Sequence, residues 1–217
     1  MINDLKKRDC DIKIKLTPSG TQFLHFEMDI QGDHLEFLPA STMGEQFGAI
    51  VNALYTLFSE IHAGYYDAHE ESDAHCQTLC TNGYVIHTKI AKVEWDNEGC
   101  EIEIVMSRKV DNNVEYENDT IELEVKSYDD VLKKYTVKTI DLCYAVAKAC
   151  TEVLKEYGFY GYKCSTEYDT FKIHQLLYIK SYALLNFEAR ELMIKEKNEY
   201  ARKTSFEKEI ELLLFDM

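Results

Sequence analysis

Apolar and polar residues alternate along several stretches of this chain, and a period of two predicts β-strands. The first two stretches flank a TPSGT turn and predict a hairpin, while later ones are separated by the polar turns DNEG and DNN. Successive side chains of a strand point to opposite faces of a sheet, so each stretch has one apolar face. The predicted strands cover residues 12–16, 24–30, 35–37, 84–91, 100–106 and 121–125.

Elsewhere the apolar positions recur every three or four residues, which predicts helices. The clearest pattern covers residues 47–61 and follows Thr42 and Glu45, which have the spacing of a capping box. A second helix is predicted over residues 140–157. We expect it to end at Gly158, because glycine readily adopts the left-handed conformation found after helix ends.

The C-terminal third is predicted to be helical with one loop. The FYGY run at residues 159–162 is the predicted loop, and a helix is predicted over residues 173–184. Acid–base pairs four residues apart predict a further helix over residues 188–203. Thr204 and Glu207 then have the spacing of a capping box before a short last helix.

These elements predict an α+β protein, with an antiparallel sheet of about six strands and helices packed on one face of it. Apolar residues make up 46% of the 217 residues, which is sufficient for a substantial core. Neither a linker rich in Pro, Gly and Ser nor a change in composition divides the chain. We therefore expect a single domain over residues 1–217.

The cysteines and the start of the chain favour a cytoplasmic protein. The seven cysteines are an odd number and are scattered along the chain, unlike the dense pairs of a secreted disulfide scaffold. No apolar segment follows the basic residues at the N-terminus, and no apolar run approaches the roughly 18 residues that span a bilayer. We expect reduced thiols and a cytoplasmic location.

Negative charge is concentrated in two parts of the chain. The formal net charge is −15. Residues 94–124 contain eleven acidic and two basic residues, and residues 60–75 contain five acidic residues and no Lys or Arg. Direct binding to nucleic acid or to an anionic membrane is disfavoured, because phosphate contacts need clustered Lys and Arg.

The acidic residues of the predicted strands are expected on one face of the sheet. Glu101 and Glu103 alternate with apolar neighbours, as do Glu122 and Glu124, so the pleat places them away from the core. Like charges on neighbouring strands repel. This face is interpreted as a docking surface for a basic protein or, alternatively, as a surface that keeps the protein soluble. The predicted partner-binding residues are Trp95, Asp96, Glu98, Glu101, Glu103, Glu122, Glu124, Tyr65 and Tyr66.

The segment HEESDAHCQTLC, residues 69–80, is the densest group of candidate metal ligands in the chain. In a helix, His69, Asp73, Cys76 and Cys80 would share one face. Imidazole and thiolate groups bind zinc, so His69, Cys76 and Cys80 are the candidate ligands. The spacing does not supply a complete set of four, and a further ligand would have to come from elsewhere in the chain.

The order of the elements, WDNEG at a hairpin of the acidic strands and GFYGY at a helix exit resemble bacterial immunity proteins of polymorphic toxin systems. The resemblance covers the middle and C-terminal parts of the chain. It implies a non-enzymatic inhibitor that neutralises a toxin domain, commonly a nuclease with a basic active-site cleft. We therefore predict an acidic binding protein of the immunity type, without a cofactor.

Two other functions are compatible with the sequence. A metal-binding enzyme would be centred on residues 62–87. A structural subunit would bury its C-terminal helix, with four apolar residues in succession at 212–215, against another copy. No P-loop, GxGxxG, nucleophile elbow, HExxH or EF-hand pattern is present.

Overall fold

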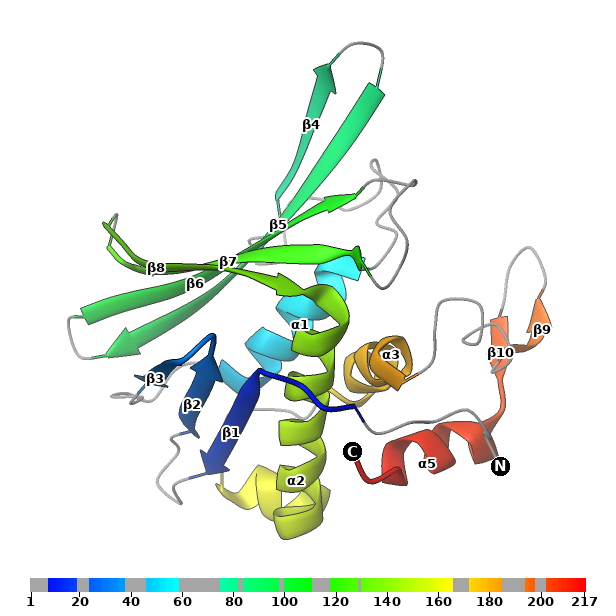
Figure 1. The fold of residues 1–217 in the computed structure, drawn as a ribbon. Helices are drawn as coiled ribbons and strands as arrows, with labels where there is room; N and C mark the ends of the chain where they lie inside the picture. Colours follow the sequence, from blue (N-terminus) through cyan, green and yellow to red (C-terminus); the bar gives the residue numbers. More distant parts are fainter. Residues whose placement is uncertain are drawn as a thin grey trace.

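The computed structural model describes most of the chain as an α+β structure with antiparallel strands (Figure 1). The predicted fold class is confirmed at this level. Among the helices that are described, none is long and apolar enough to cross a membrane. The described residues are 8–18, 24–37, 46–58, 75–81, 84–97, 100–110, 118–128, 130–165, 172–184, 194–197 and 202–217.

The N-terminal strands form a three-stranded antiparallel sheet, as the alternating pattern predicts. β1 (Lys13–Pro18) pairs with β2 (Leu24–Ile30), which pairs with β3 (Asp33–Phe37). Gln31 and Gly32 form the turn between β2 and β3, with φ angles of 50° and 88°. Two consecutive residues with positive φ characterise a type I′ turn, whose twist matches that of paired strands.

The central strands form a second sheet in the order β4-β5-β6-β7-β8, with every neighbouring pair antiparallel. The predicted meander corresponds to β5 (Tyr84–Asn97), β6 (Cys100–Val110) and β7 (Thr120–Ser127). β4 (His75–Thr81) and β8 (Asp130–Lys138) extend it at its two edges and were not predicted.

A single sheet of about six strands is not confirmed, because the described strands divide between three-stranded, five-stranded and two-stranded sheets. The two-stranded sheet consists of β9 (Ile194–Lys197) and β10 (Arg202–Thr204). The prediction of a helix over residues 188–203 is therefore wrong at residues 194–197 and 202–203, which form strands. Acid–base pairs four residues apart stabilise a helix by only about 0.2–0.5 kcal/mol each. The strand register instead places Glu196 opposite Lys203.

The helices that the apolar period predicts are present, and one contains an interruption. The described helices are α1 (Gln46–Phe58), α2 (Thr139–Ser165), α3 (Ile173–Leu184) and α5 (Phe206–Leu214). Within α2, Gly158 has φ 64° and ψ 173°, at the predicted helix end. The chain then resumes a helix, so the loop predicted at residues 159–162 is wrong. Glycine reaches this conformation at low cost and here kinks the helix.

α5 begins one residue later than its predicted cap implies. Ser205 is the N-cap instead of Thr204, because its Oγ accepts a hydrogen bond from the Lys208 backbone N at 3.4 Å. Ser205 Oγ also donates to Glu207 Oε2 at 2.8 Å. The capping pair predicted before α1 lies outside the described residues.

Both larger sheets and the helices contribute to one continuous apolar core. Figure 1 shows α1, α2 and α3 on one side of the five-stranded sheet, with the three-stranded sheet on the same side. α1 packs on β5 and β6, and α2 packs on β1 and β8. The largest fully buried apolar side chains are Phe26, Met28, Ile30, Leu54, Leu57, Ile104, Met106 and Ile121.

Polar contacts at the β2–β3 turn connect the two larger sheets. Asp33 accepts hydrogen bonds from Tyr135 Oη at 2.8 Å and from Lys133 Nζ at 3.0 Å, and these bonds lower the pKa of Asp33. Burial, together with the bond to Asp33, raises the pKa of Tyr135 to about 12. Gln31 Nε2 donates to the Thr136 carbonyl at 2.8 Å. β8 therefore contacts the three-stranded sheet as well as its own.

A buried carboxylate connects the five-stranded sheet to the helices. Asp119, which directly precedes β7, accepts hydrogen bonds from Arg108 Nε at 2.7 Å and from Tyr182 Oη at 3.2 Å. Arg108 Nη1 also donates to the Leu57 carbonyl at the end of α1, at 3.0 Å. The Asp119 carbonyl accepts from the Thr139 backbone N at 2.9 Å, where α2 begins. Asp119 thus contacts β6, α2 and α3 directly, and Arg108 extends the contact to the end of α1.

We expect Asp119→Ala to lower the free energy of unfolding by about 3 kcal/mol, because it leaves the largely buried Arg108 without its carboxylate. Glu122→Ala is the matched control. It removes an exposed ion pair with Lys134 and should cost about 0.5 kcal/mol. Urea denaturation of the parent and both variants measures the difference, and equal effects would contradict the role assigned to Asp119.

Candidate partner-binding surfaces

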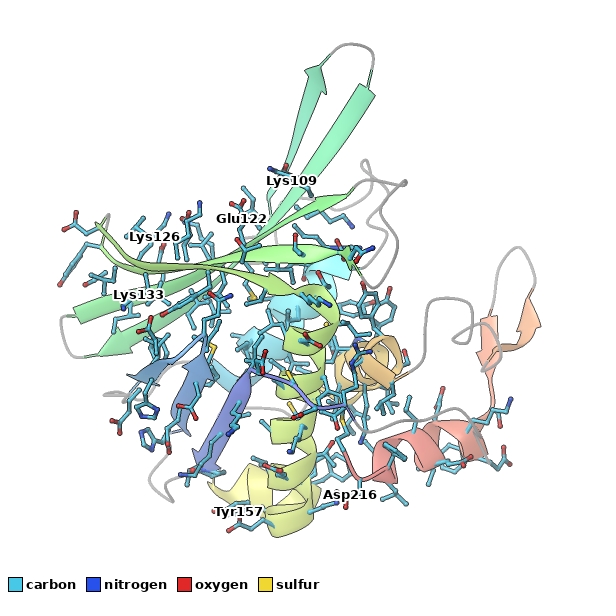
Figure 2. The ribbon with its side chains drawn as sticks, in the orientation of Figure 1. Lys109, Glu122, Lys126, Lys133, Tyr157 and Asp216 are labelled. Carbon is cyan, nitrogen blue, oxygen red and sulfur yellow. The ribbon has the colours of Figure 1, made fainter. Side chains whose placement is uncertain are left out.

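The described acidic residues of β6 and β7 lie on the face of the sheet that points away from the core. Glu103, Glu122 and Glu124 are half-buried and alternate with buried apolar residues of the same strands. Figure 2 shows Glu122 and Lys126 on the side of the sheet opposite the helices. The orientation predicted from the alternating pattern is therefore confirmed for these three glutamates.

Lysines of the same sheet neutralise the glutamates on β7. Lys134 Nζ of β8 lies 3.3 Å from Glu122 and 2.9 Å from Glu124. Lys126 Nζ lies 3.5 Å from Glu124. The hydrogen bond from Lys134 lowers the pKa of Glu124 and raises that of Lys134. The small stability cost expected from repulsion between glutamates is therefore offset on β7, where Lys126 and Lys134 pair with them.

The acidic segment 94–124 is balanced by basic residues wherever its side chains are described. Glu103 lies 3.6 Å from Lys92 Nζ, and Asp119 lies 2.7 Å from Arg108 Nε. With the two paired glutamates of β7, these are the four acidic side chains of the segment that the structure describes. Each of the four has a basic partner. The described side chains of this face therefore form charge pairs, while the strand register places Glu94 opposite Glu103 and Asp96 opposite Glu101.

The other predicted partner-binding residues are not gathered into a described site. For Trp95, Asp96 and Glu101, on β5 and β6, the structure describes the backbone course alone. The strand register places Asp96 opposite Glu101, so two acidic residues occupy neighbouring positions there. The predicted residues outside the described part of the chain are Glu98, Tyr65 and Tyr66.

The candidate zinc ligands do not share a helical face. Residues 75–81 form β4 and pair with β5, so the helical spacing expected for Cys76 and Cys80 is wrong. Pairing with the β-branched residues of a neighbouring strand overrides a helical spacing in the local sequence. His69 lies outside the described residues. Within the described ranges, no group of three or more His, Cys, Asp or Glu residues is arranged to hold a metal ion.

Large exposed apolar side chains gather in two groups. Of the eight such side chains in the described part of the chain, six belong to these groups. The hairpin group consists of Tyr128, Val131 and Leu132 at the β7–β8 turn, which are 57%, 52% and 56% exposed. Tyr128 has a φ of 54°, which is unfavourable for a bulky residue, and a register shift places Leu132 in a bulge.

The helix group consists of Phe206, Ile210 and Leu214 on α5, which are 70%, 37% and 70% exposed. A spacing of four residues places them along one face of the helix. Leu212, on the other side, is fully buried. The apolar period predicts this helix, but apolar residues occupy both of its sides, so the sequence does not show which side meets the core.

A buried lysine holds the C-terminal end of α5. Lys180 of α3 is fully buried. Its Nζ donates hydrogen bonds to Thr151 Oγ1 at 3.0 Å and to the carbonyls of Leu213 and Phe215 at 3.1 and 2.8 Å. The last carbonyls of a helix lack intrahelical donors and carry partial negative charge, so an ammonium group stabilises them. Burial lowers the pKa of Lys180 to about 8.

Sequence reasoning missed the role of Lys180. The available signal is its position within the apolar repeat of residues 173–184, where a lysine is out of place. A lysine is almost never fully buried without partners, so a lysine on the apolar side of a helix indicates buried acceptors. The sequence does not show where those acceptors come from.

The fold and these surfaces define an antiparallel α+β protein with two exposed apolar groups on a charged surface. A comparison with protein-family models, curated proteins and solved structures finds no significant match to this chain. Its function is therefore inferred from its own residues.

We expect Lys180 to make the folded state more stable as the pH rises. Its pKa is about 8 in the folded protein against 10.5 in the unfolded chain. Between these values the unfolded chain binds a proton that the folded protein does not, so the free energy of unfolding increases with pH. The increase from this residue is on the order of 3 kcal/mol. Denaturation from about pH 7 to pH 10.5 measures it, and Lys180→Met should lack it.

Lys148→Met is the matched control for this pH dependence. Lys148 is an exposed lysine of α2, and its removal should leave the increase in place. Subtracting the profile of the Lys180→Met variant removes the contributions of other groups, such as Tyr135. If the parent and Lys180→Met show the same slope above pH 8, folding does not lower the pKa of Lys180.

We also expect the purified protein to contain less than one zinc ion per chain. The strand conformation of β4 removes the helical ligand spacing on which a zinc site at Cys76 and Cys80 depended. Elemental analysis of protein purified without chelators checks this. One zinc per chain, lost in Cys76→Ser and in Cys80→Ser, would instead establish a metal site.

Proposed function

We propose that the protein is a non-catalytic binding protein of the immunity type, which captures a basic protein partner, such as a nuclease toxin domain, in the cytoplasm. The observation that supports this most directly is the grouping of exposed apolar side chains. Six of the eight that are described belong to the hairpin group or the helix group. Single exposed apolar residues are ordinary on protein surfaces, whereas larger exposed patches mark interaction sites.

The charge of the chain favours a basic partner. A net charge of −15 attracts a basic protein over distances longer than direct contacts and raises the association rate. The face with Glu103, Glu122 and Glu124 adds little to this attraction, because lysines neutralise it. The same net charge repels nucleic acid and anionic membranes.

Assembly with further copies of the chain is a second candidate function, and the exposed helix group is the observation that favours it. A metal-binding enzyme centred on residues 62–87 has no comparable support. The described residues of that segment are β4 and the beginning of β5, which form a hairpin.

Affinity capture with the tagged full-length chain is expected to retain a protein of net positive charge in an equimolar complex. The association rate should fall about tenfold between about 0.05 M and 0.5 M NaCl, because salt screens the attraction between the charged proteins. Association kinetics with the purified partner at both salt concentrations measure this. A rate that does not change with salt, or the absence of any basic partner, would contradict the proposal.

Serine substitutions within at least one apolar group should raise the Kd about tenfold or more. Ile173→Ser is the matched control, because Ile173 is 40% exposed but belongs to neither group. If the control weakens binding as much as the grouped substitutions do, the apolar groups are not the binding surface.

A further inference from the structure

We infer that the helix group is the anchor for the basic partner and that it enters an apolar groove, bordered by Lys and Arg, on that partner. This inference rests on the proposed function and specifies the binding surface on each of the two proteins. Phe206, Ile210 and Leu214 follow one face of α5 at intervals of four residues. Amphipathic helices bind apolar grooves through anchors with this spacing.

The packing of α5 directs the helix group outward. Leu212 lies two residues from both Ile210 and Leu214 and is fully buried. Two residues correspond to a rotation of about 200° around an α-helix, so the helix group lies on the side of α5 opposite Leu212. Figure 1 shows α5 at the periphery of the fold, next to α3. The anchor residues therefore face away from the body of the protein.

Both ends of α5 are fixed, so the helix group is in place before a partner arrives. At the N-terminal end, Ser205 caps the helix. At the C-terminal end, Lys180 donates to the carbonyls of Leu213 and Phe215. A helix that is already ordered loses less conformational entropy on binding than one that must fold first.

Acidic residues border the helix group on both sides. Glu207 and Glu211 follow one edge of it and Glu209 the other, as the helical period places them. Residues 206–211 contain three acidic residues and a single basic one, Lys208, while Asp216 is paired with Lys155. A groove bordered by Lys and Arg complements this arrangement in charge as well as in its apolar floor.

The hairpin group has different surroundings. Lys126, Lys133 and Lys134 lie on the two strands that carry it, and each is paired with a carboxylate. The charges in these pairs cancel. The lysines next to the hairpin group and their carboxylates therefore add no net charge, whereas residues 206–211 have a formal net charge of −2, which favours the helix group for a basic partner.

A second copy of the chain is a poorer occupant of the helix group for two reasons. In a two-fold pair of α5 helices, an acidic edge of one copy meets an acidic edge of the other in either orientation. The three side chains also offer only on the order of 300 Å² of apolar area, against about 800 Å² per partner in a stable interface. A groove gains further contacts from its walls, which a second helix does not provide.

The test uses the full-length chain with the photo-crosslinking residue p-benzoylphenylalanine in place of Phe206, and the matched control has it in place of Tyr128. After irradiation in a cell extract, we expect several-fold more adduct from position 206. The crosslinked peptide of the partner should contain apolar residues next to Lys or Arg, and the yield should fall as salt is raised. Comparable adducts from both positions, or an adduct only with a second copy, would overturn the inference.

Equilibrium binding to the purified partner provides the second measurement. The double variant Phe206→Ser with Leu214→Ser should raise the Kd about 30-fold or more, and Tyr128→Ser with Leu132→Ser less than about threefold. All four side chains are more than half exposed, so unchanged thermal melts will show that the fold is retained. If a basic partner binds both double variants alike, the inference fails and the proposed function stands. If the parent captures no basic partner, the proposed function itself fails.

Discussion

The buried carboxylate of Asp119 is the interaction on which the arrangement of the sheet and the helices depends. A buried charge is stable only when its partners compensate for the lost hydration. Those partners come from different elements, Arg108 from β6 and Tyr182 from α3, and Arg108 also contacts the end of α1. Moving any of these elements would remove a hydrogen bond from one of these two charged groups. The apolar core allows several ways of packing helices on a sheet, and this network selects one of them.

Lys180 has a similar role for α5, with the opposite charge. Leu212 is the fully buried side chain of α5 and lies on its inward side. Lys180 binds two carbonyls at the C-terminal end of the same helix. The orientation of α5 therefore depends on hydrogen bonds to a buried ammonium group as well as on apolar packing. The helix group takes no part in these contacts. Phe206 and Leu214 are each 70% exposed, so most of their apolar surface is left for a partner.

The sequence predicts those elements whose apolar period is strong, such as β2, the β5–β7 meander and α3. β8 escapes prediction because most of its side chains are exposed, with burial alternating only at Tyr135 and Val137. Edge strands often carry lysine in this way, since the charge discourages pairing with other chains. The charge pairs on the surface are harder to predict than the strands, because they depend on contacts between residues far apart in the sequence. The alternating pattern is sufficient to orient Glu124, but its partner Lys134 is supplied by the β7–β8 register, which the local pattern does not specify.

Long-range charge and apolar contact act at different stages of binding. The attraction from a net charge of −15 does not need an acidic patch on the sheet, so the lysines that neutralise that face leave the attraction in place. It brings a basic protein close without choosing a docking surface. Apolar side chains act after contact, where they slow dissociation. On α5 the two effects coincide, because glutamates border apolar residues on a helix fixed at both ends. The charge that speeds the encounter then also favours the correct orientation, which net charge alone cannot do.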